Sequence, residues 1–288
     1  TGINMQHPAF ATTDVDDFTH TNPFGDGNFV GWCDPDNPNH SPEFQCNNKL
    51  IGAWDFADES WPDEDDGPED SDGHGSHVAA TAVGNRIQAQ WPFSPENYRP
   101  IISGIAPRAK VIAYDACNQE GACFSTDIVA AIDQAILDGV DVINASLSIA
   151  ENAFTGSMQQ AHLNALEAGI VSVRATGNSG PRLETVGPEP PWAISVAAVS
   201  NPDREFSDDG TSVTPDPSKA DQMAFFSSRG PADPTLGDVL KPDLAAPGRR
   251  IFAADKAAAD DPEQYQLLSG TSMASPHVAG AAALLRAL

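Results

Sequence analysis

Short apolar segments that alternate with helix-like segments constrain the fold of this chain most strongly. Strand-like runs are expected over residues 111–114, 140–143, 170–175 and 193–199. Helical spacing is expected over residues 78–83, 125–136 and 157–168, and in a last segment after Ser272. Strands that alternate with helices over short connections form βαβ units and a mainly parallel sheet. Such a sheet is covered by helices on both faces, which agrees with strands that are almost entirely apolar.

Length and composition indicate one globular domain. The chain has 288 residues, of which 40% are hydrophobic and 19% are charged. This supplies enough apolar material for a sizeable core and is compatible with one α/β domain. We therefore expect a single domain over residues 1–288. Residues 1–70 are rich in Asp, Asn, Pro and Gly, and we expect them to form a loop-rich, acidic N-terminal part of that domain.

A strong acidic balance limits the partners of this chain. Lys and Arg number 15 and Asp and Glu number 41, which gives a formal net charge of −26. Nucleic-acid binders carry the opposite charge, and an acidic membrane surface would repel such a chain. The sequence also has no apolar run of the roughly 18 residues that a transmembrane helix needs. We expect a dispersed monomer that binds neither nucleic acids nor membranes.

The densest acidic cluster permits two interpretations. It consists of Asp63, Glu64, Asp65, Asp66, Glu69, Asp70 and Asp72. The simpler interpretation is solubility with some adaptation to salt. The alternative is a structural calcium site, although the cluster lacks the alternating acidic positions and the sixth-position Gly of a calcium-binding loop.

The four cysteines lie in two local pairs, Cys33 with Cys46 and Cys117 with Cys123. Four cysteines allow three connectivities, and local pairing is favoured because each bridge would close one loop. An even number of closely spaced cysteines indicates an oxidising compartment and hence secretion. The alternative is four unpaired thiols in a cytosolic protein. Because the sequence has no C-x-x-C pattern, zinc binding and thioredoxin-type chemistry are disfavoured.

Three separated segments carry residue types that are suited to acyl transfer. They are residues 72–78 (DGHGSHV), 175–180 (ATGNSG) and 270–277 (GTSMASPH). The Ser272 hydroxyl becomes a nucleophile when a base accepts its proton, and His74 is a base that works near neutral pH. The side-chain amide of Asn178 and the backbone N–H of Ser272 are suitable donors to the developing oxyanion. These segments do not supply the carboxylate that would hold the His tautomer.

These motifs resemble those of the subtilase family of subtilisin-type serine peptidases. Its H-G-T-H-V-A-G, A-x-G-N and G-T-S-M-A-x-P motifs match residues 74–80, 175–178 and 270–276. Residues 226–231 (FSSRGP) and 241–248 (KPDLAAPG) also look like segments of bacterial members. The matches follow the family order over most of the chain. The resemblance implies a three-layer, doubly wound α/β fold with a mainly parallel sheet and helices on both faces.

The resemblance also implies a role for each matched residue. His74 would be the general base, Ser272 the nucleophile and Asn178 the oxyanion donor. Two segments would bind substrate, namely Ser146, Leu147 and Ser148 at a strand edge, and Ala175, Thr176 and Gly177 along the other wall of the primary pocket. The implied activity is that of a secreted serine endopeptidase that acts on polypeptides and needs no cofactor for catalysis. A secretion signal and an inhibitory propeptide would lie upstream.

The sequence departs from the family pattern near the base, at the pocket and at its beginning. Ser76 and Ala80 replace Thr and Gly near the base, and Ser148 replaces a Gly at the pocket, where it adds bulk. The family aspartate of D-[ST]-G-[IV] has no counterpart, because the sequence begins with Thr1-Gly2-Ile3, one residue after its expected position. We therefore expect a catalytic-domain fragment, truncated at both ends, that is itself inactive or nearly so.

Other functional classes agree less well with the motifs. An α/β-hydrolase places its Ser before its His, within G-x-S-x-G, whereas here the His comes first. A chymotrypsin-like β-barrel conflicts with the alternation of strands and helices. A different class of function is a non-catalytic subtilase fold that binds peptides or acts as a scaffold, and the missing aspartate is the observation that supports it.

Overall fold

The computed structural model describes most of the chain as two compact units. It describes residues 1–57, 67–91, 99–118, 121–147, 151–200, 222–232 and 239–288. Unit 1 comprises Thr1–Gln90, Arg99–Asp138 and Ala253–Gln266, and unit 2 comprises Trp91–Tyr98, Gly139–Phe252 and Leu267–Leu288. Each unit has its own parallel sheet, so we describe them one after the other. The expectation of a single domain over residues 1–288 stays a prediction.

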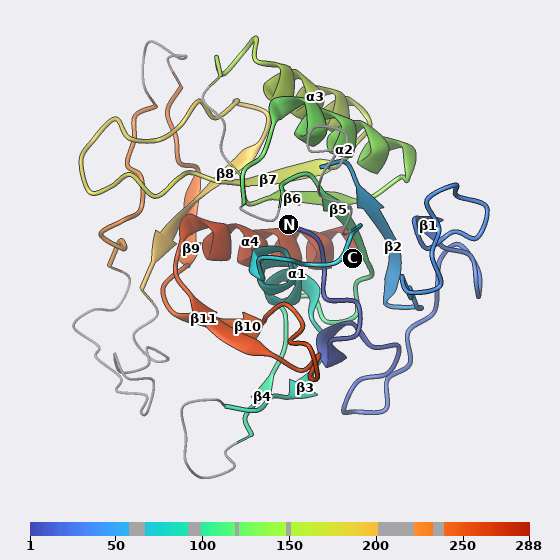
Figure 1. Cartoon of the computed structure of the whole chain (residues 1–288). Coiled ribbons are helices and arrows are strands. Elements are labelled where there is room, and N and C mark those ends of the chain that lie inside the picture. Colours follow the sequence, from blue (N-terminus) through green and yellow to red (C-terminus); the bar gives the residue numbers. More distant parts are fainter. Residues whose placement is uncertain (58–66, 92–98, 119–120, 148–150, 201–221, 233–238) are drawn as a thin grey trace. The chain divides into compact units, whose positions relative to one another are not determined.

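Unit 1 is built on a three-stranded parallel sheet (Figure 1). The strand order is β1-β2-β5, with β1 at Val30–Gly31, β2 at Leu50–Asp55 and β5 at Val111–Asp115. Helices α1 (His74–Val83) and α2 (Ser125–Leu137) both contact β5. The unit also contains a short 3-10 helix, η1 (Pro8–Phe10), and an antiparallel pair of β3 (Ile87–Gln88) with β4 (Ile101–Ile102).

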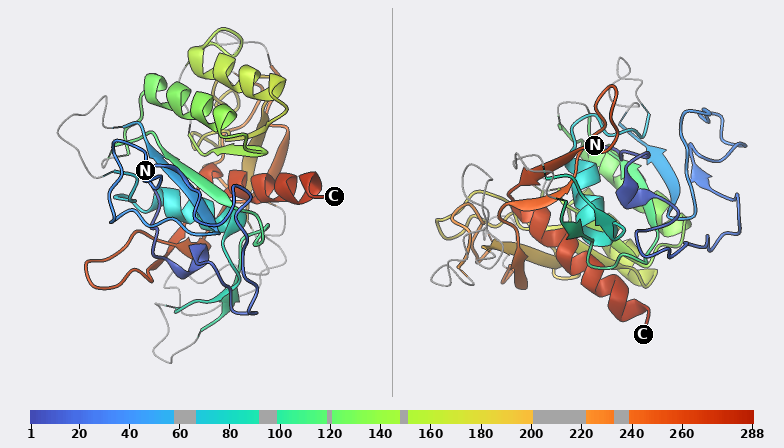
Figure 2. Two further views of the ribbon diagram at one scale, coloured as in Figure 1. Left: turned by 90° about the vertical axis from the view of Figure 1, so that its right-hand side faces the viewer. Right: turned by 90° about the horizontal axis from the view of Figure 1, so that it is seen from below.

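Unit 2 has three layers, with helix α3 and helix α4 on opposite faces of a parallel sheet (Figures 1 and 2). The sheet order is β6-β7-β8-β9, and the strands are Val142–Ala145, Val171–Ala175, Ile194–Val199 and Leu244–Pro247. Helix α3 spans Ser157–Glu167 and contacts β7, whereas α4 spans Thr271–Arg286 and contacts all four strands. Small side chains such as Ala274 and Ala279 are buried against Val173 and Val196, so α4 lies close to the sheet.

Strands β10 (Ile251–Ala254) and β11 (Tyr265–Leu268) form a further two-stranded sheet. Both strands contain residues of each unit. Within the described residues, no helix is long and apolar enough to cross a membrane. The expected three-layer α/β fold with mainly parallel strands is confirmed.

The expected elements agree with the structure where periodicity was strong. Strands β5, β7 and β8 and helices α2, α3 and α4 lie at or within one to two residues of their predicted positions. The prediction for α1 began too late, because the helix starts at His74 instead of residue 78. The predicted strand at residues 140–143 begins two residues too early, since β6 starts at Val142. The expected surface loop at residues 201–221 lies outside the described residues.

Strands β2 and β9 were missed for local reasons. The β9 sequence Leu-Ala-Ala-Pro has no β-branched residue and ends in Pro, so it carries little strand signal. Strand β2 contains Gly52, and a glycine inside a run of residues argues against a strand prediction. In the structure a Cβ at Gly52 would lie 2.3 Å from a methyl carbon of Val30, so the close approach of β1 requires glycine there.

Both predicted disulfides are present in the structure, where Cys33 is bonded to Cys46 and Cys117 to Cys123. The two bridges close loops with sequence separations of 13 and 6 residues. The alternative of four free thiols is therefore wrong for this structure. Cross-links of this kind stabilise a fold mainly by reducing the conformational freedom of the unfolded chain.

A buried lysine holds the parts of unit 1 together. Lys49 is fully buried, and its Nζ donates to three backbone carbonyls, those of Val83, Pro107 and Ala109. Val83 is the last residue of α1, so the ammonium group satisfies a carbonyl that the helix itself leaves unpaired. Lys49 thereby links the start of β2, the C-terminal end of α1 and the loop that leads into β5.

We expect Lys49→Ala to lower the free energy of unfolding by about 3 kcal/mol, because one buried and two part-buried carbonyls lose their donor and a cavity is left. The measurement is the denaturant midpoint of the variant against wild type. Lys110→Ala is the matched control, since Lys110 Nζ makes a long, exposed contact of 3.5 Å with the carbonyl of Arg108. A loss at Lys49 no larger than the control loss would contradict this role.

Candidate active site

The predicted base, His74, is the first residue of α1 in unit 1. The preceding Gly73 has φ 99°, and a Cβ there would lie 2.1 Å from a carboxylate oxygen of Asp255, so only glycine is accommodated. Because Gly73 has no capping side chain, Asp70 takes that role. Its carboxylate accepts hydrogen bonds from the backbone N–H groups of Gly73 and Ser76, both at 2.7 Å. Asp70 thus fixes the turn that presents His74.

The surroundings of His74 keep its imidazole neutral at pH 7. Burial of the ring lowers its pKa, and this is the largest effect on it. The carboxylates of Asp72 and Asp70 act in the opposite direction, but the lowering by burial is larger. A neutral imidazole is the form that can accept a proton, so the electrostatics agree with the predicted role as general base.

Ser76, which replaces the Thr of the family motif, keeps a hydroxyl group at this position. Ser76 is fully buried, and its Oγ accepts a hydrogen bond of 2.7 Å from the backbone N–H of Asn4. A Thr would offer the same hydroxyl group, so the replacement retains the contact between α1 and the first residues of the chain.

The predicted nucleophile, Ser272, is the second residue of α4 in unit 2. Its Oγ lies 3.4 Å from the carbonyl oxygen of Ser146, at the end of β6. In the other direction, Ser146 Oγ donates to the carbonyl of Ser272 at 2.8 Å. The predicted residues Ser146 and Ser272 are therefore in direct contact, and the helix dipole places partial positive charge at this end of α4.

Two residues that the sequence analysis did not single out extend this contact. Ser275 Oγ donates to Asn144 Oδ1 at 2.6 Å, and Asn144 Nδ2 donates to Ser146 Oγ at 3.1 Å. Together with the bond from Ser146 to Ser272, they form a continuous chain of hydrogen bonds from the first turn of α4 to β6. A polar residue at position 144, inside an otherwise apolar strand, was the available signal.

The predicted oxyanion donor, Asn178, is held by Thr271. Asn178 Oδ1 accepts hydrogen bonds from the backbone N–H of Thr271 at 2.9 Å and from Thr271 Oγ1 at 3.1 Å. The backbone N–H of Gly177 is also 3.1 Å from Thr271 Oγ1. Since Oδ1 is engaged by Thr271, Nδ2 is the atom of this side chain that can donate to a bound oxyanion. Thr271 is a positioning residue that sequence reasoning missed.

The nitrogen atoms of the two predicted oxyanion donors lie close to one point next to Gly270. The position that a Cβ of Gly270 would occupy lies 3.5 Å from Asn178 Nδ2 and 3.6 Å from the backbone N of Ser272. Glycine leaves this point free of side-chain atoms. Two nitrogen donors near one such point are compatible with the stabilisation that a tetrahedral oxyanion needs.

The predicted pocket residues differ in their burial and in their hydrogen bonds. Ala175 and Thr176 are buried, and Thr176 Oγ1 donates to the carbonyl of Val196 at 3.1 Å, so this side chain is directed to β8. Leu147 is half-buried directly after Ser146, whereas Ser148 lies outside the described residues. The substrate-binding roles of these residues and of Gly177 stay predictions.

The structure brings the predicted residues of unit 2 together and places His74 in unit 1. Ser146, Asn178 and Ser272 surround the first turn of α4. No group of three or more His, Cys, Asp or Glu that could bind a metal ion occurs among the described residues. Four members of the acidic cluster lie outside the described residues, namely Asp63, Glu64, Asp65 and Asp66. A calcium site in this cluster therefore stays a prediction.

Comparison with known proteins gives one family. The model of the subtilase family matches residues 1–288. Subtilisin-like protease SBT2.2 of Arabidopsis thaliana is 39% identical over 224 residues, covering 72% of this chain and 25% of the relative. Subtilisin-like protease SBT4.9 of the same plant is 29% identical over 349 residues, covering 84% of this chain and 47% of the relative. This chain thus spans a quarter to a half of the length of these relatives.

Solved structures show the same fold. Sphericase aligns with a TM-score of 0.60 at 27% identity, covering 99% of this chain and 74% of that chain. The S41 psychrophilic protease aligns with a TM-score of 0.59 at 27% identity, with the same coverage.

The electrostatic balance at His74 gives a testable prediction. Asp72→Asn removes a negative charge that raises the pKa of His74, so we expect the imidazole to titrate at a lower pH in the variant. The measurement is histidine NMR chemical shift against pH. Asp36→Asn is the control, since it removes an exposed carboxylate of the same unit that is not among the charges acting on His74. A pKa of His74 that is unchanged or higher in Asp72→Asn would contradict this balance.

Proposed function

Because this chain belongs to the subtilase family, we propose that it is the catalytic part of a serine endopeptidase that hydrolyses peptide bonds through an acyl-enzyme intermediate. The observation that carries the proposal is that Asn178 Nδ2 and the backbone N of Ser272 both lie close to one point at Gly270 that holds no side-chain atom. A peptide-binding scaffold has no need of two nitrogen donors placed around such a point.

In the proposed reaction, Ser272 Oγ attacks the scissile carbonyl carbon while His74 accepts the hydroxyl proton. The carbonyl oxygen becomes an oxyanion that accepts hydrogen bonds from Asn178 and from the backbone of Ser272. His74 then donates its proton to the leaving amine as the C–N bond breaks. Water, deprotonated by His74, hydrolyses the acyl-enzyme and releases Ser272.

The third member of the triad in this family is an aspartate, which the resemblance would place directly before Thr1. Loss of the triad carboxylate costs roughly 10⁴-fold in kcat in enzymes of this kind. Measurements of activity therefore use the full-length protein with the residues that precede Thr1.

Further proposals concern the setting of the enzyme. We infer secretion from the two disulfides, polypeptide substrates and an upstream inhibitory propeptide from the resemblance, and a monomeric state from the strong negative charge. Catalysis by this mechanism uses no cofactor, and a bound calcium ion would have a structural role.

A fluorophosphonate probe tests the nucleophile. We expect it to label the full-length protein at Ser272 and to leave Ser272→Ala unlabelled, as read by mass spectrometry of the modified peptide. Ser269→Ala is the matched control and retains labelling, because Ser269 is an exposed neighbour in the same segment. A folded protein that is not labelled would favour the alternative, a non-catalytic peptide-binding or scaffold protein.

Substitutions test the base and the oxyanion donor. His74→Ala should abolish hydrolysis of a chromogenic peptide, and Asn178→Ala should lower kcat by about 10²–10³-fold with little change in KM. The control is His277→Ala, since the His277 ring contacts only the carbonyl of Met273 within its own helix among the hydrogen bonds of the described residues. Full activity in either of the first two variants would show that its assigned role is wrong.

A further inference from the structure

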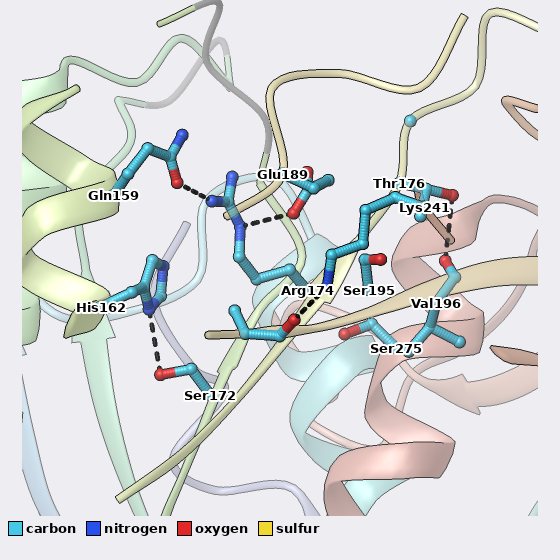
Figure 3. A network of polar contacts seen from close by, with 12 residues as sticks. Gln159, His162, Ser172, Arg174, Thr176, Glu189, Ser195, Val196, Lys241 and Ser275 are labelled. Carbon is cyan, nitrogen blue, oxygen red and sulfur yellow. Dashed lines mark hydrogen bonds and ion pairs between the residues drawn. The ribbon is translucent and has the colours of Figure 1, made fainter. Parts of the chain in front are cut away.

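A buried ion pair lies beside the candidate site in unit 2 (Figure 3). Arg174 Nε is 3.3 Å from Glu189 Oε2, and both side chains are completely buried. The guanidinium group also donates to the side-chain oxygen of Gln159 on α3. Arg174 belongs to β7, and Glu189 belongs to the segment that leads into β8. One ionic contact therefore joins a strand, a helix and a loop.

Stability alone does not account for this pair. Burial lowers the pKa of Arg174 and raises that of Glu189, and each charge partly offsets the effect on the other. Apolar residues of similar volume at such positions are often as stabilising or more so. Among the described residues, Gln159 Nε2, Arg174 Nη2 and Glu189 Oε1 also lack a hydrogen-bond partner, which adds to the cost. Because the pair is costly to bury and gives little stability, its role is more readily explained by the fixed position that it gives to the segments it joins.

The two residues of the ion pair flank the loop that carries Asn178. Arg174 is the residue before the predicted pocket wall, Ala175 to Gly177, and lies four residues before Asn178. Glu189 comes after the loop of residues 175–188 that carries Asn178. The ion pair therefore closes this loop at its base. At the other end, Thr271 holds Asn178 Oδ1 and the backbone of Gly177.

The segment after Glu189 is anchored on the same side. Trp192 Nε1 donates to the backbone carbonyl of Gln159 at 2.8 Å. Lys241 Nζ donates to the carbonyl of Ala193 at 2.7 Å and to Asp243 Oδ2 at 2.6 Å. Figure 3 shows the contacts of Arg174 with Gln159 of α3 and with Glu189. The base of the loop thus has a charged link, Arg174 to Glu189, set among these hydrogen bonds.

We propose that Arg174 and Glu189 are positioning residues whose buried ion pair holds the base of the 175–188 loop and thereby aims the Asn178 amide at the oxyanion. The inference rests on the proposed peptidase function. Oxyanion donors lose their effect when they move by a fraction of an ångström, and a misplacement of about 1 Å can cost about 10²-fold in rate. The ion pair acts through Asn178 and does not touch the substrate.

The main test is Arg174→Met with Glu189→Met in the full-length protein, which replaces the pair by apolar side chains and leaves no unpaired charge. We expect the thermal midpoint to stay within a few degrees of wild type, while kcat falls at least tenfold and KM changes less than threefold. The matched control is Arg286→Met with Asp141→Asn, because that pair in the same unit is exposed. A kcat equal to that of wild type in the Met pair would overturn the proposal.

A double-mutant cycle with Asn178→Ala separates positioning from general damage. If the pair acts through Asn178, the Met pair causes no further loss of kcat once Asn178 is alanine. An equal loss in both backgrounds would show that the pair acts elsewhere and would overturn the proposal. Should the Met pair not fold, Arg174→Lys serves instead, since it keeps the charge but cannot reproduce the bond geometry to both Glu189 and Gln159.

Failure of this proposal can be told apart from failure of the proposed function. If the wild-type protein shows neither fluorophosphonate labelling nor hydrolysis, the peptidase proposal fails and the positioning role fails with it. If wild type is active and the Met pair and Arg174→Lys both keep its kcat, only the positioning role is wrong.

Discussion

The hydrogen bonds between Asn178 and Thr271 are the contact on which the arrangement of unit 2 depends. They join the loop after β7 to the first turn of α4, two elements far apart in sequence. Parallel strands place their carboxyl ends at one edge of a sheet, and α4 starts at that edge because its small side chains let it lie against all four strands. Ser272 and the predicted oxyanion donor Asn178 are thereby brought together at the first turn of α4.

In unit 1, charged side chains bind both ends of helix α1. His74 must stand at the start of a helix whose capping position is a glycine, and the carboxylate of Asp70 supplies the missing acceptor. At the C-terminal end of the helix, the ammonium group of Lys49 donates a hydrogen bond to the backbone carbonyl of Val83. Helix α1 is thus held at both termini by side chains of the charge that its dipole favours at each end.

Much of the fold could be predicted from the sequence, and the remainder depended on distant contacts. Periodic apolar segments predicted β7, α2 and α4, whereas the roles that local motifs assign to His74, Asn178 and Ser272 stay predictions. Strand β9 was missed because Leu-Ala-Ala-Pro gains its conformation from pairing with β8 instead of from its own residues. The roles of Thr271 and Asp70 were missed because each is defined by a partner that folding brings near. Arg174 stood inside a run that was interpreted as an apolar strand, and only the structure shows the Glu189 that neutralises it.

The ion pair of Arg174 and Glu189 also constrains how unit 2 can form. Neither charge can leave water at an acceptable cost before the other is in place. Strand β7, the Gln159 face of α3 and the segment before β8 must therefore become ordered in one step, because any partial structure would bury a lone charge. The same coupling makes these three elements open together, so that the loop carrying Asn178 belongs to a cooperative unit of the interior in spite of its position at the surface of the sheet.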